Sequence, residues 1–164
     1  MSKSRKFGNS RTAGFIASIP AISMESSGII ERCKFNFSYL DLSKPEALQD
    51  ELSLVFFNEM FEKLKHYSMY PIAHWTTEAA GRGNGTMLEI YGSFPKKSDF
   101  VHPTSVPHDA IWGRFRMDRT VRLAGFFVPN ELNHKLCARE KFRFCTNTFY
   151  VVYVDLHHRF YVTK

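Results

Sequence analysis

The sequence predicts an α+β protein in which an early strand and one long amphipathic helix pack on an antiparallel sheet. Three patterns predict this class: an alternating segment at residues 33–40, apolar residues at helical spacing up to Tyr67, and a C-terminal third rich in β-branched and aromatic residues. The chain has 164 residues and 44% are hydrophobic. A chain of this length can bury a core without a disulfide or a structural metal ion.

The first strand and the helix follow from local spacing. Residues 33–40 alternate between aromatic or apolar and polar side chains, which is typical of a half-buried strand. Ser43 and Glu46 match a capping box, and Pro45 lies in the first turn, where its missing donor costs nothing. We therefore expect the helix that follows to end near Tyr67 and to bury one face, formed by Leu48, Leu52, Val55, Phe56, Phe57, Met60, Phe61 and Leu64.

The rest of the chain divides into a loop-rich middle, at residues 68–110, and a strand-rich final third. In the middle we expect short strands around His74 and Trp75 and at residues 86–91. Residues 111–116 and 121–128 predict a hairpin. Residues 148–154 are β-branched and aromatic throughout, which indicates a central strand buried on both faces.

Domain organisation and compartment are predicted from composition. Residues 1–28 are read as a flexible basic arm ahead of one domain at 29–164, and no stretch is long and apolar enough for a membrane span. Cys33, Cys137 and Cys145 are an odd, scattered set without a C-x-x-C motif, which predicts a reducing, cytoplasmic setting without disulfides, metal or cofactor. Cys145 is expected to be a buried, unreactive sulfur.

The net charge of +6 is unevenly distributed. Residues 1–24 carry four basic side chains and no acidic ones, residues 25–113 are acidic overall, and residues 114–164 carry ten basic against four acidic residues. Aromatic residues are interleaved with the C-terminal basic ones, a pattern that suits a polyanion with stackable bases. The alternative is that the aromatics form the core of a sheet and the arginines its solvated face.

The densest polar group follows the last long strand and contains Asp155, His157, His158, Arg159 and Tyr161. Histidine can move protons near neutral pH, and arginine can stabilise charge that develops on a phosphate. Together they suit metal-independent cleavage of RNA, whose 2′-hydroxyl supplies the nucleophile. The alternative is that Asp155 and one histidine form a structural cap at the end of the strand.

Three segments resemble the RelE/ParE family of toxins: residues 112–116, residues 122–126, and residues 149–161, which end in His-His-Arg-Phe-Tyr. The resemblance implies a helix on a curved antiparallel sheet and, for RelE-like members, cleavage of messenger RNA on the ribosome without a cofactor. It implies a catalytic set of Arg122, His157, His158 and Tyr161, and an antitoxin protein as partner. Four further arginines are expected to bind RNA: Arg114, Arg116, Arg119 and Arg159.

Two other functions compete with this one. A non-catalytic module from a phage or mobile element would bind nucleic acid or protein through the same basic surface. Two H-x-T triplets, at His74 and His102, resemble the paired motifs of 2H phosphoesterases, although Pro103 would disrupt the second strand. The oligomeric state does not follow from the sequence.

Overall fold

The computed structural model describes residues 23–43 and 53–162, apart from Arg82, Asn84, Ala138 and Glu140. The chain divides into two compact units, Met1–Ile30 and Glu31–Lys164. Residues 1–22 of the predicted basic arm lie outside the described residues, and so do Pro45 and Glu46 of the predicted capping box. The architecture below is that of the second unit.

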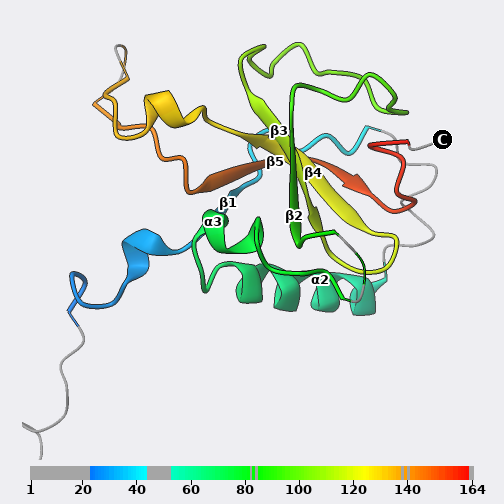
Figure 1. Cartoon of the computed structure of the whole chain (residues 1–164), viewed down its shortest axis with the longest axis horizontal. Helices are drawn as coiled ribbons and strands as arrows, with labels where there is room; N and C mark the ends of the chain where they lie inside the picture. The colour runs from blue at the N-terminus through cyan, green and yellow to red at the C-terminus, as the bar shows by residue number, and fades with distance from the viewer. Residues whose placement is uncertain are drawn as a thin grey trace, which may run out of the picture. The chain divides into compact units, whose positions relative to one another are not determined.

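The second unit has an α+β fold built on one five-stranded mixed sheet (Figure 1), which confirms the predicted class. The strand order is β1-β5-β4-β3-β2, and the strands are β1 (Lys34–Asn36), β2 (Leu88–Gly92), β3 (Ile111–Arg116), β4 (Arg122–Phe127) and β5 (Thr148–Asp155). The predicted β3–β4 hairpin and the predicted strand β5 are confirmed. The sheet is not wholly antiparallel, because β1 pairs with β5 in parallel.

The helices that the structure describes in this unit are α2 (Leu54–Tyr67) and α3 (Ile72–Trp75), with a 3₁₀ turn η2 (Asn130–Leu132). A further 3₁₀ turn, η1 (Ile29–Glu31), includes the last residues of the first unit. Helix α2 ends at Tyr67 as predicted, and Ser53 caps its N-terminus by accepting a hydrogen bond from the amide of Phe56 at 3.1 Å. The apolar stripe that the sequence predicts to be buried is buried only near the C-terminal end of the helix. There Leu64 is buried, whereas most of the stripe farther up α2 is exposed, as at Val55, Phe57 and Phe61.

Two local predictions in the first half of the chain are wrong. His74 and Trp75 lie in helix α3 and not on a strand, because the chain turns after Pro71 and Trp75 is buried against Tyr67. The strand predicted at residues 33–40 shortens to β1, and Phe37, expected on its buried face, is 42% exposed.

Alternation along the strands gives the sheet two different faces. The helix face carries Leu88, Phe115, Leu123, Phe127, Phe149 and Val151, which form one core with Leu64, Tyr67 and Trp75 from the helices. The loop face carries Trp112, Ala124, Phe126 and Val152, which form a second core with Phe160 and with residues of the long loop that joins β2 to β3.

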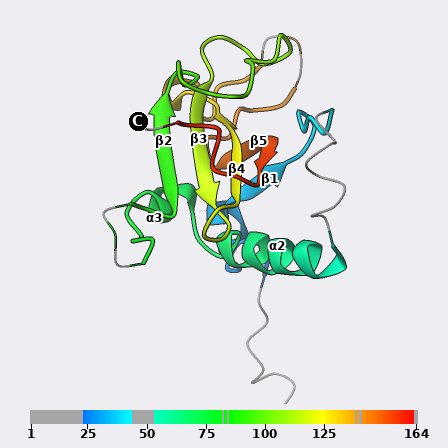
Figure 2. The same ribbon diagram turned by 90° about the vertical axis from the view of Figure 1, so that its right-hand side faces the viewer.

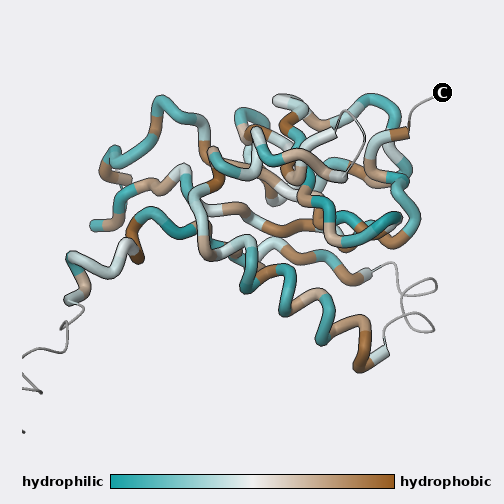
Figure 3. Tube along the Cα trace, turned by 60° about the horizontal axis from the view of Figure 1, so that its bottom comes forward, coloured by the Kyte–Doolittle hydropathy of each residue, from teal (hydrophilic) through white to brown (hydrophobic). Residues whose placement is uncertain are grey.

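Helix α2 and the β2–β3 loop, which cover the two faces, also lie toward opposite ends of the strands. In Figure 2, α2 runs across the ends of β3 and β4 that meet in their hairpin, and the β2–β3 loop lies at the other ends. Figure 3 shows apolar and polar residues alternating along the helix. One end of the loop face is thereby left for polar side chains.

Candidate functional site

An arginine cluster occupies the end of the loop face nearest the β3–β4 hairpin. We use this name for Arg114, Arg116 and Arg122 together with Glu89. Strand register places Glu89 opposite Arg114, and Arg116 opposite Arg122. On its other side Arg122 is opposite Asp155 of β5. The cluster therefore spans three adjacent strands, with Asp155 on a fourth, and the hydrogen-bonded ladders hold these positions next to one another.

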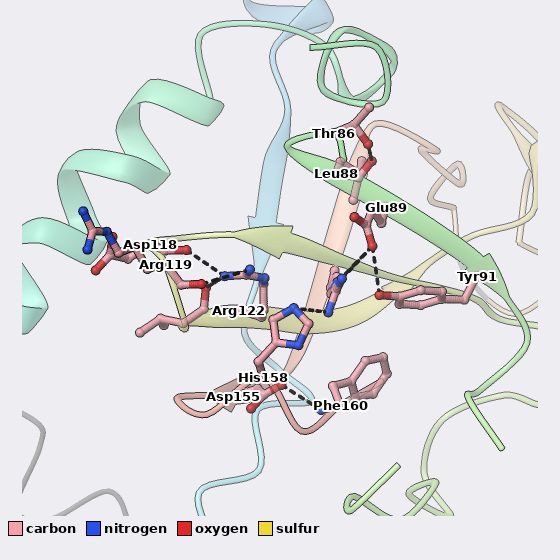
Figure 4. A network of polar contacts seen from close by, with 12 residues as sticks. Thr86, Leu88, Glu89, Tyr91, Asp118, Arg119, Arg122, Asp155, His158 and Phe160 are labelled. Atoms are coloured by element: carbon pink, nitrogen blue, oxygen red, sulfur yellow. Dashed lines mark hydrogen bonds and ion pairs between the residues drawn. The ribbon is translucent and has the colours of Figure 1, made fainter. Parts of the chain in front are cut away.

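Arg114 lies at the centre of the cluster and is only 7% exposed. Its Nη2 and Nε atoms donate to Oε2 of Glu89 at 2.7 and 3.2 Å. Its Nη1 lies 2.9 Å from Nε2 of His158 (Figure 4). A guanidinium has only donors, so Nε2 of His158 must be the acceptor, which places the proton of the neutral imidazole on Nδ1.

His158 is held in an uncommon backbone conformation and an electropositive setting. Its φ of 58° lies in the left-handed region, where a residue other than glycine or asparagine usually needs support from its surroundings. Burial lowers the pKa of His158, and the positive charges of Arg114 and Arg122 lower it further. The imidazole is therefore neutral at neutral pH and able to accept a proton.

Asp155 provides the support for the backbone around His158. Its carboxylate accepts hydrogen bonds from the amides of His157, Arg159 and Phe160 at 3.2, 2.9 and 2.7 Å. The alternative was a structural cap formed by Asp155 and one histidine, and its Asp155 part is confirmed, with backbone amides as partners. Asp155 thereby turns the chain directly after β5 and returns His158 to the arginine cluster.

Arg122 is buried and engaged with the backbone of the hairpin turn. Its exposed fraction is 2%. Its guanidinium donates to the carbonyl groups of Asp118, Val121 and Arg119 at 2.7, 2.8 and 3.2 Å. Burial lowers the pKa of Arg122 to about 10, with a further contribution from Arg116 and Arg114, so it remains cationic at neutral pH. Arg122 thus supplies positive charge to the cluster while it holds the turn together.

A pair of stacked tyrosines extends the site toward the edge strand β2. The rings of Tyr91 and Tyr161 are nearly parallel, 7° apart, with centroids separated by 4.9 Å. The hydroxyl of Tyr91 donates to Oε2 of Glu89 at 3.3 Å, and the guanidinium carbon of Arg114 lies 5.7 Å from the Tyr91 ring. Beside the pair is a groove of about 680 Å³ whose lining includes Lys96 and Lys97. Aromatic and cationic side chains are therefore continuous from His158 to this groove.

The glycine-rich segment at residues 81–85 approaches the other side of the cluster. A Cβ atom on Gly85 would lie 3.1 Å from Oε1 of Glu89 and 3.2 Å from Nη2 of Arg116. Both side chains therefore face the backbone at Gly85. The close approach explains why a small residue stands at this position.

The structure gathers only part of the predicted site. Arg114, Arg116, Arg122 and His158 come together, and Tyr161 joins them through Tyr91. The other predicted residues are placed differently. His157 and Arg119 are exposed, and Arg119 lies in the hairpin turn, where its carbonyl accepts from Arg122. Arg159 forms an ion pair with Asp99 at 2.5 Å.

Two residues of the site, Glu89 and Tyr91, were not predicted from the sequence. Glu89 supplies the main counter-charge of Arg114, and Tyr91 connects the cluster to Tyr161. The pattern that would have found them is the alternation of Glu89 and Tyr91 with Leu88 and Ile90 on the predicted strand at residues 86–91, which places both polar groups on one face.

The histidines of the two H-x-T triplets contact residues of different cores. His74 stacks on Tyr70 beside Trp75, which belongs to the helix-face core. His102 contacts Trp112, which belongs to the loop-face core. The arrangement gives no support to a 2H phosphoesterase site, in which both histidines face one phosphodiester.

Within the described residues, no group of three or more His, Cys, Asp or Glu side chains is placed to hold a metal ion. Among the helices that the structure describes, none is long and apolar enough to cross a membrane. No family model, curated protein or solved structure matches the chain.

Proposed function

We propose that the protein binds single-stranded RNA on the loop face and cleaves it without a metal ion, as RelE-like toxins do. The observation that carries this proposal is the 2.9 Å contact between cationic Arg114 and neutral His158, beside two further arginines. A proton acceptor and several phosphate-binding charges on rigid strands are the groups that RNA cleavage requires.

The proposed reaction uses the 2′-hydroxyl of the substrate. When a phosphate draws the Nη1 donor of Arg114 away, Nε2 of His158 becomes free to accept the proton of the 2′-hydroxyl. The 2′-oxygen then attacks phosphorus, the bond to the 5′-oxygen breaks, the leaving 5′-oxygen takes a proton from water, and a 2′,3′-cyclic phosphate remains. Arg114 and Arg116 stabilise the extra negative charge of the transition state, and Arg122 adds to the positive potential.

The wider setting rests on the resemblance of the C-terminal third to RelE-like toxins. It includes a RelE-like form of the sheet, action on messenger RNA at the ribosome in the cytoplasm, and an antitoxin as partner. The stacked tyrosines and the groove with Lys96 and Lys97 are consistent with a substrate that offers both bases and phosphates.

A second candidate is binding of RNA without cleavage. Two observations favour it: Nε2 of His158 already accepts a hydrogen bond from Arg114, and Arg122 is 2% exposed. In this case the arginine cluster would act as a fixed positive patch, and binding would weaken as salt is added without any product being formed.

The test is incubation of the purified protein with labelled single-stranded RNA in the presence of EDTA. We expect cleavage to products that end in 2′,3′-cyclic phosphate, and a loss of about 100-fold or more in rate for His158→Gln. His157→Gln is the matched control and should cleave at the wild-type rate. Salt-sensitive binding without product would support the second candidate. Absence of RNA binding, or full activity of His158→Gln, would contradict the proposed site.

A further inference from the structure

The three cysteines, scattered in the sequence, gather at one corner of the sheet. Cys33 directly precedes β1, Cys145 lies shortly before β5, and the register of the two strands pairs Lys34 with Thr148. The negative charge of a Cys145 thiolate acts on Cys33, and Cys145 shares the lining of one cavity with Cys137. This corner lies at the β1 edge, whereas the stacked tyrosines lie at the β2 edge on the other side of the sheet.

Cys145 is neither buried nor without charged neighbours, so the prediction of a buried sulfur without a charged setting is wrong. It is half-buried, and Nζ of Lys34 lies 3.5 Å from its Sγ atom. The amide of Lys34 donates to the carbonyl of Asn147 at 2.9 Å, so the strand pairing places the backbone of Lys34 beside the segment that carries Cys145.

These contacts favour the thiolate form of Cys145. Partial burial acts to raise its pKa, but hydrogen bonds from the amide of Asn147 and the hydroxyl of Thr148, together with the charge of Lys34, outweigh it. The pKa of Cys145 is therefore lowered. The thiolate is the nucleophilic form of cysteine, so these contacts increase the fraction of reactive sulfur at neutral pH.

Cys33 provides an internal contrast. It is 2% exposed, and burial raises the pKa of its thiol to about 12. Its sulfur is therefore both inaccessible and protonated at neutral pH. A reagent that reaches the folded protein should distinguish Cys145 from Cys33 by both properties.

The cavity beside Cys145 has about 450 Å³, a volume typical of small-molecule sites. Its described lining is cationic and aromatic: Lys34 and Arg143 are the charged residues, and Phe142, Phe144 and Tyr150 form walls. Nη1 of Arg143 donates to the carbonyl of His134 at 2.8 Å, which fixes this second positive charge. The cavity therefore favours a small molecule that carries negative charge.

We propose that Cys145 is a thiol–disulfide exchange site for small disulfides that bear carboxylates. The thiolate attacks one sulfur of the disulfide and forms a new bond to Cys145, while the original sulfur–sulfur bond breaks. The released thiolate takes a proton from water, so no further oxidant is needed. Lys34 and Arg143 attract the carboxylates. This inference is independent of the proposed action on RNA.

The test compares three disulfides of similar chemistry and different charge on the folded protein. These are oxidised glutathione, which is anionic, hydroxyethyl disulfide, which is neutral, and cystamine, which is cationic. Peptide mass spectrometry identifies the modified cysteine over time. We expect an adduct on Cys145 and none on Cys33, with oxidised glutathione reacting about fivefold or more faster than cystamine. Modification of Cys137 before Cys145, or the reverse order of charge, would overturn the proposal.

Variants separate the role of Lys34 from that of the cavity. Cys145→Ser should abolish the adduct, whereas Cys137→Ser, the matched control in the same cavity, should leave its rate unchanged. Lys34→Met should slow the reaction about fivefold, and Lys34→Arg should restore most of it. Lys34 is exposed, so the fold should survive both changes, and circular dichroism checks this. An unchanged rate in Lys34→Met would show that the ammonium group does not activate the thiol.

Discussion

The helix face and the loop face of the sheet are built from alternating residues of the same strands, but they carry different chemistry. On β3, Phe115 packs into the helix-face core, while its neighbours Arg114 and Arg116 point to the loop face. The helix face is apolar along its length, whereas the loop face is aromatic at one end and carries the arginine cluster at the other. The comparison teaches that a core on one side can hold charged side chains rigidly on the other.

The largest expected effect concerns the helix face. Gly125 allows β4 to approach β5 so closely that a Cβ atom there would collide with the carbonyl oxygen of Tyr150 and lie 2.9 Å from Cζ of Phe149. Gly125→Ala should therefore reduce the free energy of unfolding by about 3 kcal/mol or prevent folding. Urea denaturation followed by circular dichroism measures the change. Gly83→Ala is the control, because nothing lies within 4 Å of a Cβ atom there; equal effects would contradict the packing argument.

The next largest effect distinguishes Arg122, which bonds to the backbone of the hairpin turn, from Arg116, which is only half-buried. Arg122→Met leaves the carbonyl groups of Asp118, Val121 and Arg119 without their donor, so we expect a loss of about 2 kcal/mol in the free energy of unfolding. Arg116→Met should lose at most about 1 kcal/mol, because Arg116 is only half-buried. Both variants should bind RNA less tightly, and their affinity should fall less steeply as salt is added. Equal stability of the two variants would show that Arg122 does not hold the turn.

The smallest effect is a pH dependence. The folded state lowers the pKa of His158, so below its ordinary pKa of about 6.5 the unfolded chain binds the proton more readily. The contribution of His158 to stability is therefore complete above pH 6.5 and is lost as the pH falls below that value. His158→Gln keeps an acceptor for Arg114 and should remove this part of the slope. Urea midpoints at pH 5.5 and 7.5 measure it, with His157→Gln as control; an unchanged slope in His158→Gln would contradict the assignment.

Local patterns in the sequence predicted which segments form strands and helices. They predicted less well which segments lie next to one another in the fold. The β3–β4 hairpin, strand β5 and the end of α2 at Tyr67 follow from alternation and helical spacing. Helix α3 was missed because the burial of Trp75 against Tyr67, a tertiary contact, decides its conformation. The parallel pairing of β1 with β5 could not be read from local spacing, because the partners Lys34 and Thr148 are far apart in the chain.

In the candidate site, too, the sequence predicted which residues are present better than it predicted their contacts. The types of its residues were predicted, including Arg114 and His158, but their contact depends on the left-handed turn that Asp155 stabilises after β5. Arg159 was grouped with them by closeness in sequence, yet it forms an ion pair with Asp99 of the β2–β3 loop. Cys145 was misjudged because its activating cation, Lys34, comes from the opposite end of the chain.

The parallel pairing of β1 with β5 also has a consequence for the order of folding. Among the strands that the structure describes, β1 comes first in the sequence, but its partner in the sheet is β5, which comes last. During synthesis the antiparallel β2–β3–β4 segment can form first, since its contacts are closer in sequence. Until the ribosome has produced β5, the backbone groups that β1 uses in this pairing lack their final partners, so they stay accessible to a chaperone up to that point.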